Sequence, residues 1–157
     1  MIVVIDTREQ KPFTFAPGVQ TEVATLNAGD YSVKGMTSLV TVERKSLSDL
    51  FGTCGAGRER FERELHRMAD MQYAAIVIEA GWHDIVRQPP HMSQVSSKVV
   101  VRSLLAWSER FNVHVYAAHN RQLAARLTFI LLERFWIDTK EGKRNGNRCF
   151  TDTKDKR

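Results

Sequence analysis

The chain opens with four β-branched apolar residues, Ile2 to Ile5, followed at once by a polar cluster, Asp6 to Glu9. A run that is apolar at every position predicts a strand buried on both faces, in the interior of a sheet. A second run of this kind, Ala74 to Ile78, lies in the middle of the chain. The fold is therefore expected to be built on a sheet that is covered on both sides.

The remaining segments alternate between strand and helix patterns. Further strands are expected at 21–26, 30–34, 39–45 and 113–116, with residues 35–38 closing a hairpin. Apolar residues at helical spacing predict helices at 47–51, 58–71, 100–111 and 123–136, the first capped by Ser46 and ended by Gly52. Residues 80–97 are expected to be rich in loop. This order predicts an α/β domain with a central mixed sheet flanked by helices.

Composition excludes several classes of protein. With 157 residues, 43% hydrophobic and 26% charged, the chain is neither collagen-like nor wholly disordered. It has no apolar stretch of the roughly 20 residues that a membrane helix needs. It also has no signal peptide at its start, so we expect an intracellular protein with no membrane partner. Two cysteines and five histidines lack metal-ligand spacing.

The positive charge is concentrated near the end of the chain. The net charge is +5, and residues 138–157 hold seven Lys/Arg against four Asp/Glu, which leaves only +2 for residues 1–137. We therefore expect an ordered domain over 1–137 and a basic, disordered tail over 138–157. The charge favours a polyanionic partner but does not identify one.

The hairpin brings acidic residues together. If it closes over residues 35–38, Lys34 faces Leu39 and Asp30 faces Glu43. Successive side chains of a strand alternate between its faces, so Glu43 and Lys45 share one face while Arg44 points away. Two carboxylates and a lysine then meet at one end of the hairpin, where Asp6 and Glu9 are candidates to join them.

Such a cluster has either a structural or a chemical role. Charged residues on a hairpin commonly form a solvated face, and a Glu-x-Lys pair alone is a weak signal. Closely packed carboxylates repel each other, however, and a divalent cation relieves this repulsion. Oxygen-rich sites suit Mg²⁺ or Mn²⁺, and a metal with an adjacent lysine is suited to phosphodiester hydrolysis. The chemical interpretation needs no small-molecule cofactor.

The motifs favour the chemical interpretation. GDY at residues 29–31 and VERKSLSDL at 42–50 resemble the signature of the XPF-type structure-specific endonuclease domain, which has an aspartate after the first strand, a Gly-Asp, and then ERKxxxD. IDTRE at 5–9 and the Gly57-Arg58 pair are similar to further motifs of that family. The resemblance covers residues 1–136.

The resemblance implies a restriction-endonuclease-like fold and metal-dependent cleavage of branched DNA (a flap, a fork or a Holliday junction) in repair or recombination. It implies that Asp30 and Glu43 are the primary metal ligands, that Lys45 orients water, and that Asp6 is an outer acid of the same catalytic site and a further metal ligand. Supporting or phosphate-contacting roles fall to Arg8, Glu9, Arg44, Asp49 and Arg58. For Arg44, we expect the backbone carbonyl to face the metal and the side chain to hold the scaffold or DNA.

Many relatives carry helix-hairpin-helix modules that grip DNA, and no such module is expected here, as in bacterial or phage-borne stand-alone versions. Two alternatives remain open. One is a catalytically silent DNA-binding or scaffold subunit of a nuclease complex, although such partners typically lose the acids that are present here. The other is a sequence-specific or exonucleolytic enzyme on the same fold.

Two helices carry further candidate surfaces. Arg60, Arg63 and Arg67 share one side of the 58–71 helix, as a phosphate-binding face or as a solvated face with intrahelical ion pairs. In the last helix, one apolar arc is expected to pack on the sheet: Leu123, Leu127, Ile130 and Leu131. A second arc is expected to form a homodimer interface, in agreement with the resemblance: Phe129, Leu132 and Trp136.

Overall fold

The computed structural model describes residues 1–91 and 93–143. Within this part of the chain, the strands β1 (Ile2–Asp6), β2 (Gln20–Ala24), β3 (Tyr31–Val33), β4 (Val40–Lys45), β5 (Tyr73–Ile78) and β6 (His114–Ala117) form one sheet. The strand order is β2-β1-β3-β4-β5-β6. β3 is antiparallel to both β1 and β4, and the other neighbours are parallel. The sheet is therefore mixed, as the sequence predicted.

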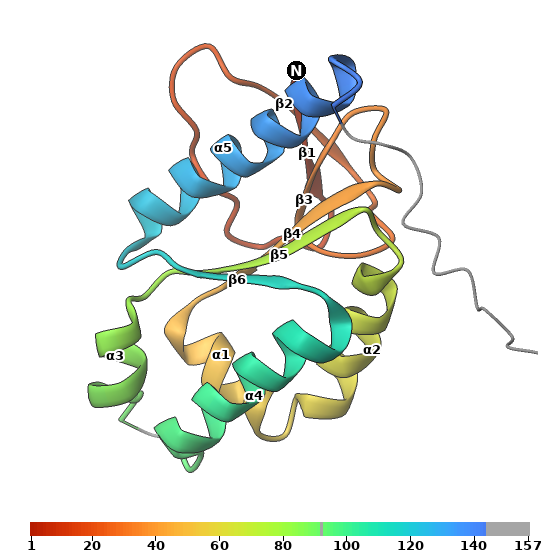
Figure 1. Cartoon of the computed structure of the whole chain (residues 1–157). Coiled ribbons are helices and arrows are strands. Elements are labelled where there is room, and N and C mark those ends of the chain that lie inside the picture. The colour runs from red at the N-terminus through yellow and green to blue at the C-terminus, as the bar shows by residue number, and fades with distance from the viewer. Residues whose placement is uncertain (92, 144–157) are drawn as a thin grey trace, which may run out of the picture.

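Helices cover both faces of the sheet (Figure 1). The helices α1 (Leu47–Cys54), α2 (Arg58–Ala69), α3 (Trp82–Arg87) and α4 (Ser97–Phe111) lie on one face, and α5 (Arg121–Lys140) lies on the other. The two apolar cores share β5: Ile76 and Ile78 pack with α1, α2 and α4, whereas Ala75 and Val77 pack with α5. Burial on both faces explains why β5 is apolar throughout.

Two helices differ from the expectations. α1 runs past Gly52 to Cys54, because the chain turns away only at Gly55 and Gly57, whose N–H groups both donate to the carbonyl of Gly52. α3 lies in the segment expected to be rich in loop. Its six residues are too few to show a helical period, although Asp84 accepts a hydrogen bond from the Gly81 N–H at 2.8 Å and Ile85 is buried.

α5 corrects two expectations. The helix continues through residues 138–140, where Asp138 pairs with Arg134 at 3.1 Å, so the ordered region extends past 137. Residues 144–157, most of the expected tail, lie outside the described residues. The expected apolar arcs are also only partly correct: Leu127 and Leu131 pack against the core as expected, but Leu132 is fully buried there while Leu123 and Ile130 are 40% and 45% exposed. The prediction that Leu132 lies at an interface is therefore wrong.

The packing face of α5 consists largely of small residues. Ala124, Ala125 and Thr128 are buried there beside Leu132 and Phe135. Small side chains let the helix approach the sheet closely, which a count of large apolar residues does not reveal. Phe129 and Trp136, the other two predicted interface residues, are partly buried against the same core.

Candidate active site

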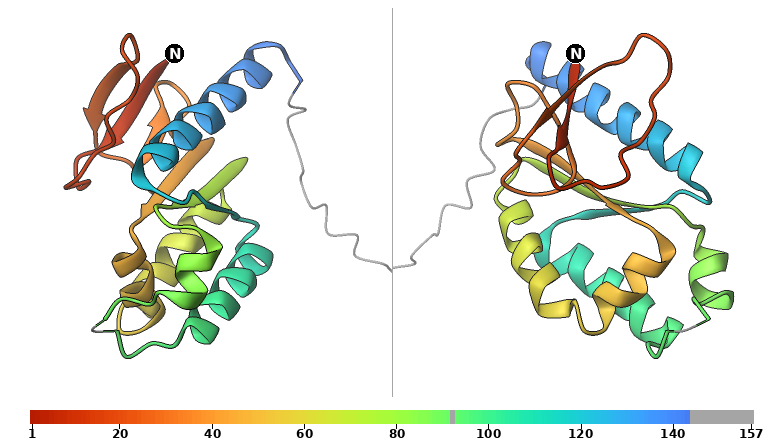
Figure 2. Two further views of the ribbon diagram at one scale, coloured as in Figure 1. Left: turned by 90° about the vertical axis from the view of Figure 1, so that its left-hand side faces the viewer. Right: turned by 180° about the vertical axis from the view of Figure 1, so that it is seen from behind.

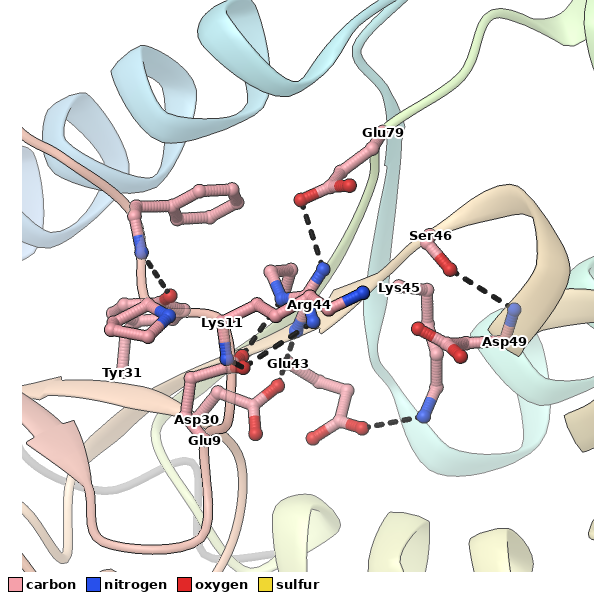
Figure 3. Close-up of polar contacts among 12 residues, drawn as sticks. Glu9, Lys11, Asp30, Tyr31, Glu43, Arg44, Lys45, Ser46, Asp49 and Glu79 are labelled. Atoms are coloured by element: carbon pink, nitrogen blue, oxygen red, sulfur yellow. Dashed lines mark hydrogen bonds and ion pairs between the residues drawn. The ribbon is translucent and has the colours of Figure 1, made fainter.

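Asp30 and Glu43 face each other across β3 and β4. Tyr31 pairs with Val42, and the Asp30 N–H donates to the Val42 carbonyl at 3.0 Å, which puts Asp30 opposite Glu43. The predicted register is thus confirmed. Asp30 is fixed further by the N–H of Arg44, which donates to its Oδ2 at 2.8 Å (Figure 3).

The glycine before Asp30 is needed for this register. Gly29 has φ +71°, a conformation that residues with a side chain rarely adopt. A Cβ at this position would lie 2.0 Å from Oγ1 of Thr41, which donates a hydrogen bond to the carbonyl of Ala28. Only glycine at position 29 therefore lets the chain approach β4 this closely. This explains physically why the Gly-Asp motif needs a glycine before the aspartate.

Ionising both Asp30 and Glu43 at this site is electrostatically unfavourable. Burial, and next to it the charge of Glu43, raise the pKa of Asp30 to about 8. Glu43 is only 8% exposed, and burial raises its pKa as well, although Lys45 opposes the shift. A carboxyl group beside another acid at low solvation takes up a proton or a cation. The pair is therefore a place where a bound cation lowers the electrostatic free energy.

Lys45 lies on the same face as Glu43, as alternation along β4 requires. Its Nζ is 2.7 Å from Oε1 of Glu43 and 4.2 Å from the centre of the Phe61 ring. Phe61 belongs to α2, so this helix forms a wall against the lysine. The ammonium group is thus held beside the carboxylate pair (Figure 3).

Arg44 points to the opposite face of β4, also as predicted. Its guanidinium group lies between Glu9 and Glu79, with its Nε 2.7 Å and its Nη1 2.9 Å from their carboxylate oxygens (Figure 3). Glu79 also pairs with Arg121, the first residue of α5, which donates to the carbonyl groups of Lys11 and Pro12. This buried network fixes β4 to the segments on the α5 side of the sheet.

Asp6 lies at the edge of the site with both oxygens occupied. Oδ1 accepts from Arg8 Nε at 2.7 Å, and Oδ2 accepts from Arg8 Nη2 at 3.0 Å and from the Leu26 N–H at 2.7 Å. Burial acts to raise the pKa of Asp6, but these hydrogen bonds outweigh it and hold the pKa below its usual value. The contacts fix the chain where β1 ends and support the neighbouring Asp30.

The last two motif residues have different positions. Asp49 lies in the first turn of α1, where its N–H donates to Oγ of the capping Ser46 at 3.1 Å, and it lines the cleft described below. Arg58 faces α4 instead. It contacts Glu62 and Ser103, and its guanidinium lies 5.1 Å from the Trp107 ring. The structure therefore does not bring Arg58 to the carboxylate pair.

The carboxylate pair lines a cleft made of two adjoining hollows of about 490 and 350 Å³. Both hollows are lined by Arg8, Asp30, Glu43, Lys45, Thr53 and Arg60. The first extends to Glu9, Gln10, Arg44, Ser48 and Asp49, and the second to Asp6, Phe61, Glu64 and Arg67. Together the linings hold six acidic and five basic side chains, so their formal charge is −1 when every acid is ionised and zero when Asp30, with its raised pKa, holds a proton.

The sequence motifs do not include Thr53, Arg60 or Glu64. Arg60 and Arg67 belong to the arginine face already noted on the 58–71 helix, but the sequence does not show which of these arginines face the cleft. Glu64 accepts a hydrogen bond from the Gly29 N–H at 2.7 Å and therefore supports the Gly-Asp turn from α2. It has no sequence signal, because only the packing of α2 on the sheet brings it there.

The donor set fits a small, hard cation. Among residues 1–91 and 93–143, no group of three His, Cys, Asp or Glu side chains is arranged to hold a metal ion. Mg²⁺ does not need such a cage, since it is commonly bound by one or two carboxylates with waters and substrate phosphate completing its shell. Asp30 and Glu43 offer two carboxylates with raised pKa values beside an open cleft.

A family model for the ERCC4 domain matches residues 5–131. The chain therefore belongs to the ERCC4 domain family, the XPF-type nuclease domains that the sequence motifs predicted. No curated protein sequence matches the chain. In the part of the chain that the structure describes, no helix combines the length and apolar character needed to cross a membrane.

Two solved structures resemble this fold. XPF from Aeropyrum pernix has a TM-score of 0.68 and 19% identity, over 92% of this chain and 64% of that chain. XPF from Aeropyrum pernix in complex with DNA has a TM-score of 0.66 and 21% identity, over 89% of this chain and 66% of that chain. Both confirm the predicted fold class, and the chain spans about two thirds of the length of either protein.

Proposed function

We propose that the chain is a metal-dependent endonuclease that hydrolyses phosphodiester bonds in branched or structured DNA (a flap, a fork or a Holliday junction) in DNA repair or recombination inside the cell. The observation that carries the proposal is the pair of Asp30 with the buried Glu43, beside Lys45, in the lining of a cleft. Membership of the ERCC4 family and the likeness to an XPF solved with DNA support it.

Asp30 and Glu43 would hold the cation, Mg²⁺ or Mn²⁺. When bound, the cation would polarise the phosphodiester, lower the pKa of a bound water and add positive charge to the cleft. For Asp6 we propose a supporting position at the edge of the site, since through Arg8 and the Leu26 N–H it fixes the end of β1 beside Asp30.

Lys45 supplies the positive charge that the reaction needs next to the cation. Held by Glu43 and the Phe61 ring, its ammonium group donates to the attacking water or to the phosphate oxygen on which negative charge develops. Arg44 and Glu9 act as positioning residues, since the Arg44 N–H fixes Asp30 while the side chain is locked on the other face. Asp49 is proposed to support the cleft beside α1, and Arg58 to support the packing of α2.

We further propose a homodimer formed through α5. Leu123 and Ile130 are seven residues apart, both are exposed, and both border a groove of about 1,220 Å³ between α5 and residues 13–16. Phe129 lines the same groove. An exposed apolar surface of this kind is typical of an interface.

The experiment that tests the function compares Mg²⁺-dependent cleavage of linear duplex, flap, fork and four-way-junction DNA by the same preparation. Cleavage of branched DNA above linear duplex, abolished by EDTA and restored by Mg²⁺ or Mn²⁺, is expected. Binding without cleavage under every metal condition would instead identify a catalytically silent subunit. Equal cleavage of linear and branched DNA would contradict the proposed substrate class.

A further inference from the structure

Arg60 differs from the other basic residues of the cleft. The others are each paired with an acid, as Arg8–Asp6, Arg44–Glu9, Lys45–Glu43 and Arg67–Glu64. Arg60 has no ion pair with any residue in 1–91 or 93–143, and its side chain is exposed. It therefore presents a full positive charge to whatever enters the cleft.

The position of Arg60 is central. It lines both hollows, as do Asp30, Glu43 and Lys45, so it lies where the two hollows adjoin. It precedes Phe61, whose ring contacts Lys45, in the first turn of α2. A phosphate bound by Arg60 is therefore a near neighbour of a phosphate placed at the carboxylate pair.

The spacing along α2 is compatible with a nucleic-acid strand. Arg67 follows Arg60 by seven residues, two helical turns or roughly 10 Å along the axis. It lines the second hollow on the same side of the helix. Because phosphates follow one another along the backbone of a single strand, two arginines on one side of a helix can contact different phosphates of the same strand. Arg63, between them, is exposed and lines neither hollow.

The size of the hollows is compatible with single nucleotides. Cavities of a few hundred Å³ hold small organic ligands, which are comparable in size with a nucleotide. Hollows of about 490 and 350 Å³ are therefore each large enough for a nucleotide of one strand.

We propose that Arg60 binds a non-reacting phosphate of a single DNA strand, and that this strand runs along α2 from the Asp30–Glu43 pair toward Arg67. The inference rests on the proposed function and deepens it. Because the bound phosphate does not change during the reaction, Arg60 stabilises the substrate complex and the transition state equally. Its removal therefore raises KM and leaves kcat near wild type.

The test compares Arg60→Ala with Arg63→Ala, a matched control on the same helix with the same charge change. The substrate is forked DNA with one single-stranded arm, cleaved in Mg²⁺ over a range of salt concentrations. For Arg60→Ala, KM is expected to rise about tenfold, as for loss of a charged hydrogen bond, with kcat within about twofold. The slope of log affinity against log salt concentration should become shallower by about 0.7, which is the value expected for the loss of one single-strand phosphate contact. Arg63→Ala should match wild type.

Three results would overturn the subsite. They are equal effects of the two substitutions, a loss in kcat without a change in KM, and an equal KM effect on blunt duplex that lacks the arm. If the wild-type protein cleaves forked DNA but Arg60→Ala behaves like Arg63→Ala, the subsite fails and the proposed function stands. If the wild-type protein cleaves no DNA in Mg²⁺ or Mn²⁺, both fail.

Discussion

The backbone N–H of Arg44 donates to Oδ2 of Asp30 at 2.8 Å, while the side chain of Arg44 is buried on the other face of β4. One residue thus links the two sides of the sheet. On one side it fixes a carboxylate of the candidate site, and on the other it neutralises Glu9 and Glu79. Consecutive motif residues on β4 therefore serve different functions because a strand alternates its faces.

Arg44→Ala is expected to destabilise the protein strongly. It leaves Glu9 and Glu79 as buried charges that have lost their central partner, and breaking a buried pair costs about 3–5 kcal/mol. Arg58→Ala is the comparison, since its pair with Glu62 is substantially exposed and contributes at most about 1 kcal/mol. Urea unfolding monitored by circular dichroism measures both. Equal losses of stability would contradict a structural role for the Arg44 network.

Glu43→Gln and Lys45→Ala are each expected to abolish most cleavage while leaving folding and DNA binding near wild type. Both side chains act on the transition state, through metal placement and charge stabilisation, and one such group is worth about 10²–10³ in kcat. Single-turnover cleavage of forked DNA measures the loss, with Arg63→Ala as the control. A variant that retains more than about a tenth of the wild-type rate would show that its assigned role is wrong.

The register of the hairpin was predictable because two local rules agree. The length of the turn at 35–38 and the two-residue period of strands both place Asp30 opposite Glu43. The separation of Arg44 from Glu43 and Lys45 follows from the same period. These relations lie within about 20 residues of sequence, where local geometry decides the outcome.

The errors concern surfaces that only tertiary packing decides. In α5, members of both predicted arcs pack on the sheet side around Ala124, Ala125 and Thr128, whose small side chains permit close contact. In α2, the packing against α4 takes Arg58 away from the cleft and turns Arg60 toward it. The spacing of apolar residues in α5 and α2 does not predict either of these packing arrangements.

Without a bound cation, the protein is expected to lose stability as the pH rises. The pKa of Asp30 is about 8 in the folded state against 3.8 for an unperturbed aspartate. The folded state therefore holds this proton more tightly than the unfolded state, and the stabilisation fades between about pH 4 and pH 8. In EDTA, Tm should fall between pH 5 and pH 8, and Mg²⁺ should restore it.

Asp30→Asn tests whether the Asp30 carboxyl group causes this pH dependence, because the variant has no ionisable group at this position. In EDTA at pH 8 it should be more stable than wild type, and Mg²⁺ should no longer raise its Tm. Glu59→Gln, an exposed change on α2, should behave like wild type at both pH values. A wild-type Tm that does not respond to Mg²⁺ at pH 8 would argue against a cation at the carboxylate pair.

DNA affinity is expected to be modest and to fall steeply from low to physiological salt. Residues 144–157 carry five Lys/Arg and two Asp/Glu, so their deletion removes +3 of the net charge of +5. The deletion should weaken binding to all DNA structures similarly and reduce the salt dependence. Fluorescence anisotropy with duplex and forked DNA measures both effects. A change in structure preference without a change in affinity would contradict a nonspecific electrostatic role.

The homodimer is expected to depend on the exposed arc of α5. Leu123→Glu combined with Ile130→Glu should give a folded monomer, since both side chains are exposed and neither belongs to the core. Leu105→Glu is the control, because Leu105 is 60% exposed on α4, across the sheet from α5. As Figure 2 shows, the two helices lie on opposite faces, so a change on α4 does not reach the α5 surface.

Size-exclusion chromatography with light scattering, at micromolar concentration, measures the oligomeric state of these variants. The wild-type protein and Leu105→Glu should both run as dimers, and the α5 double variant as a monomer with an unchanged helical signal. Dimers of the double variant would place the interface elsewhere on the molecule. A wild-type protein that is already monomeric would remove the dimer, and the groove beside Phe129 would then need another occupant.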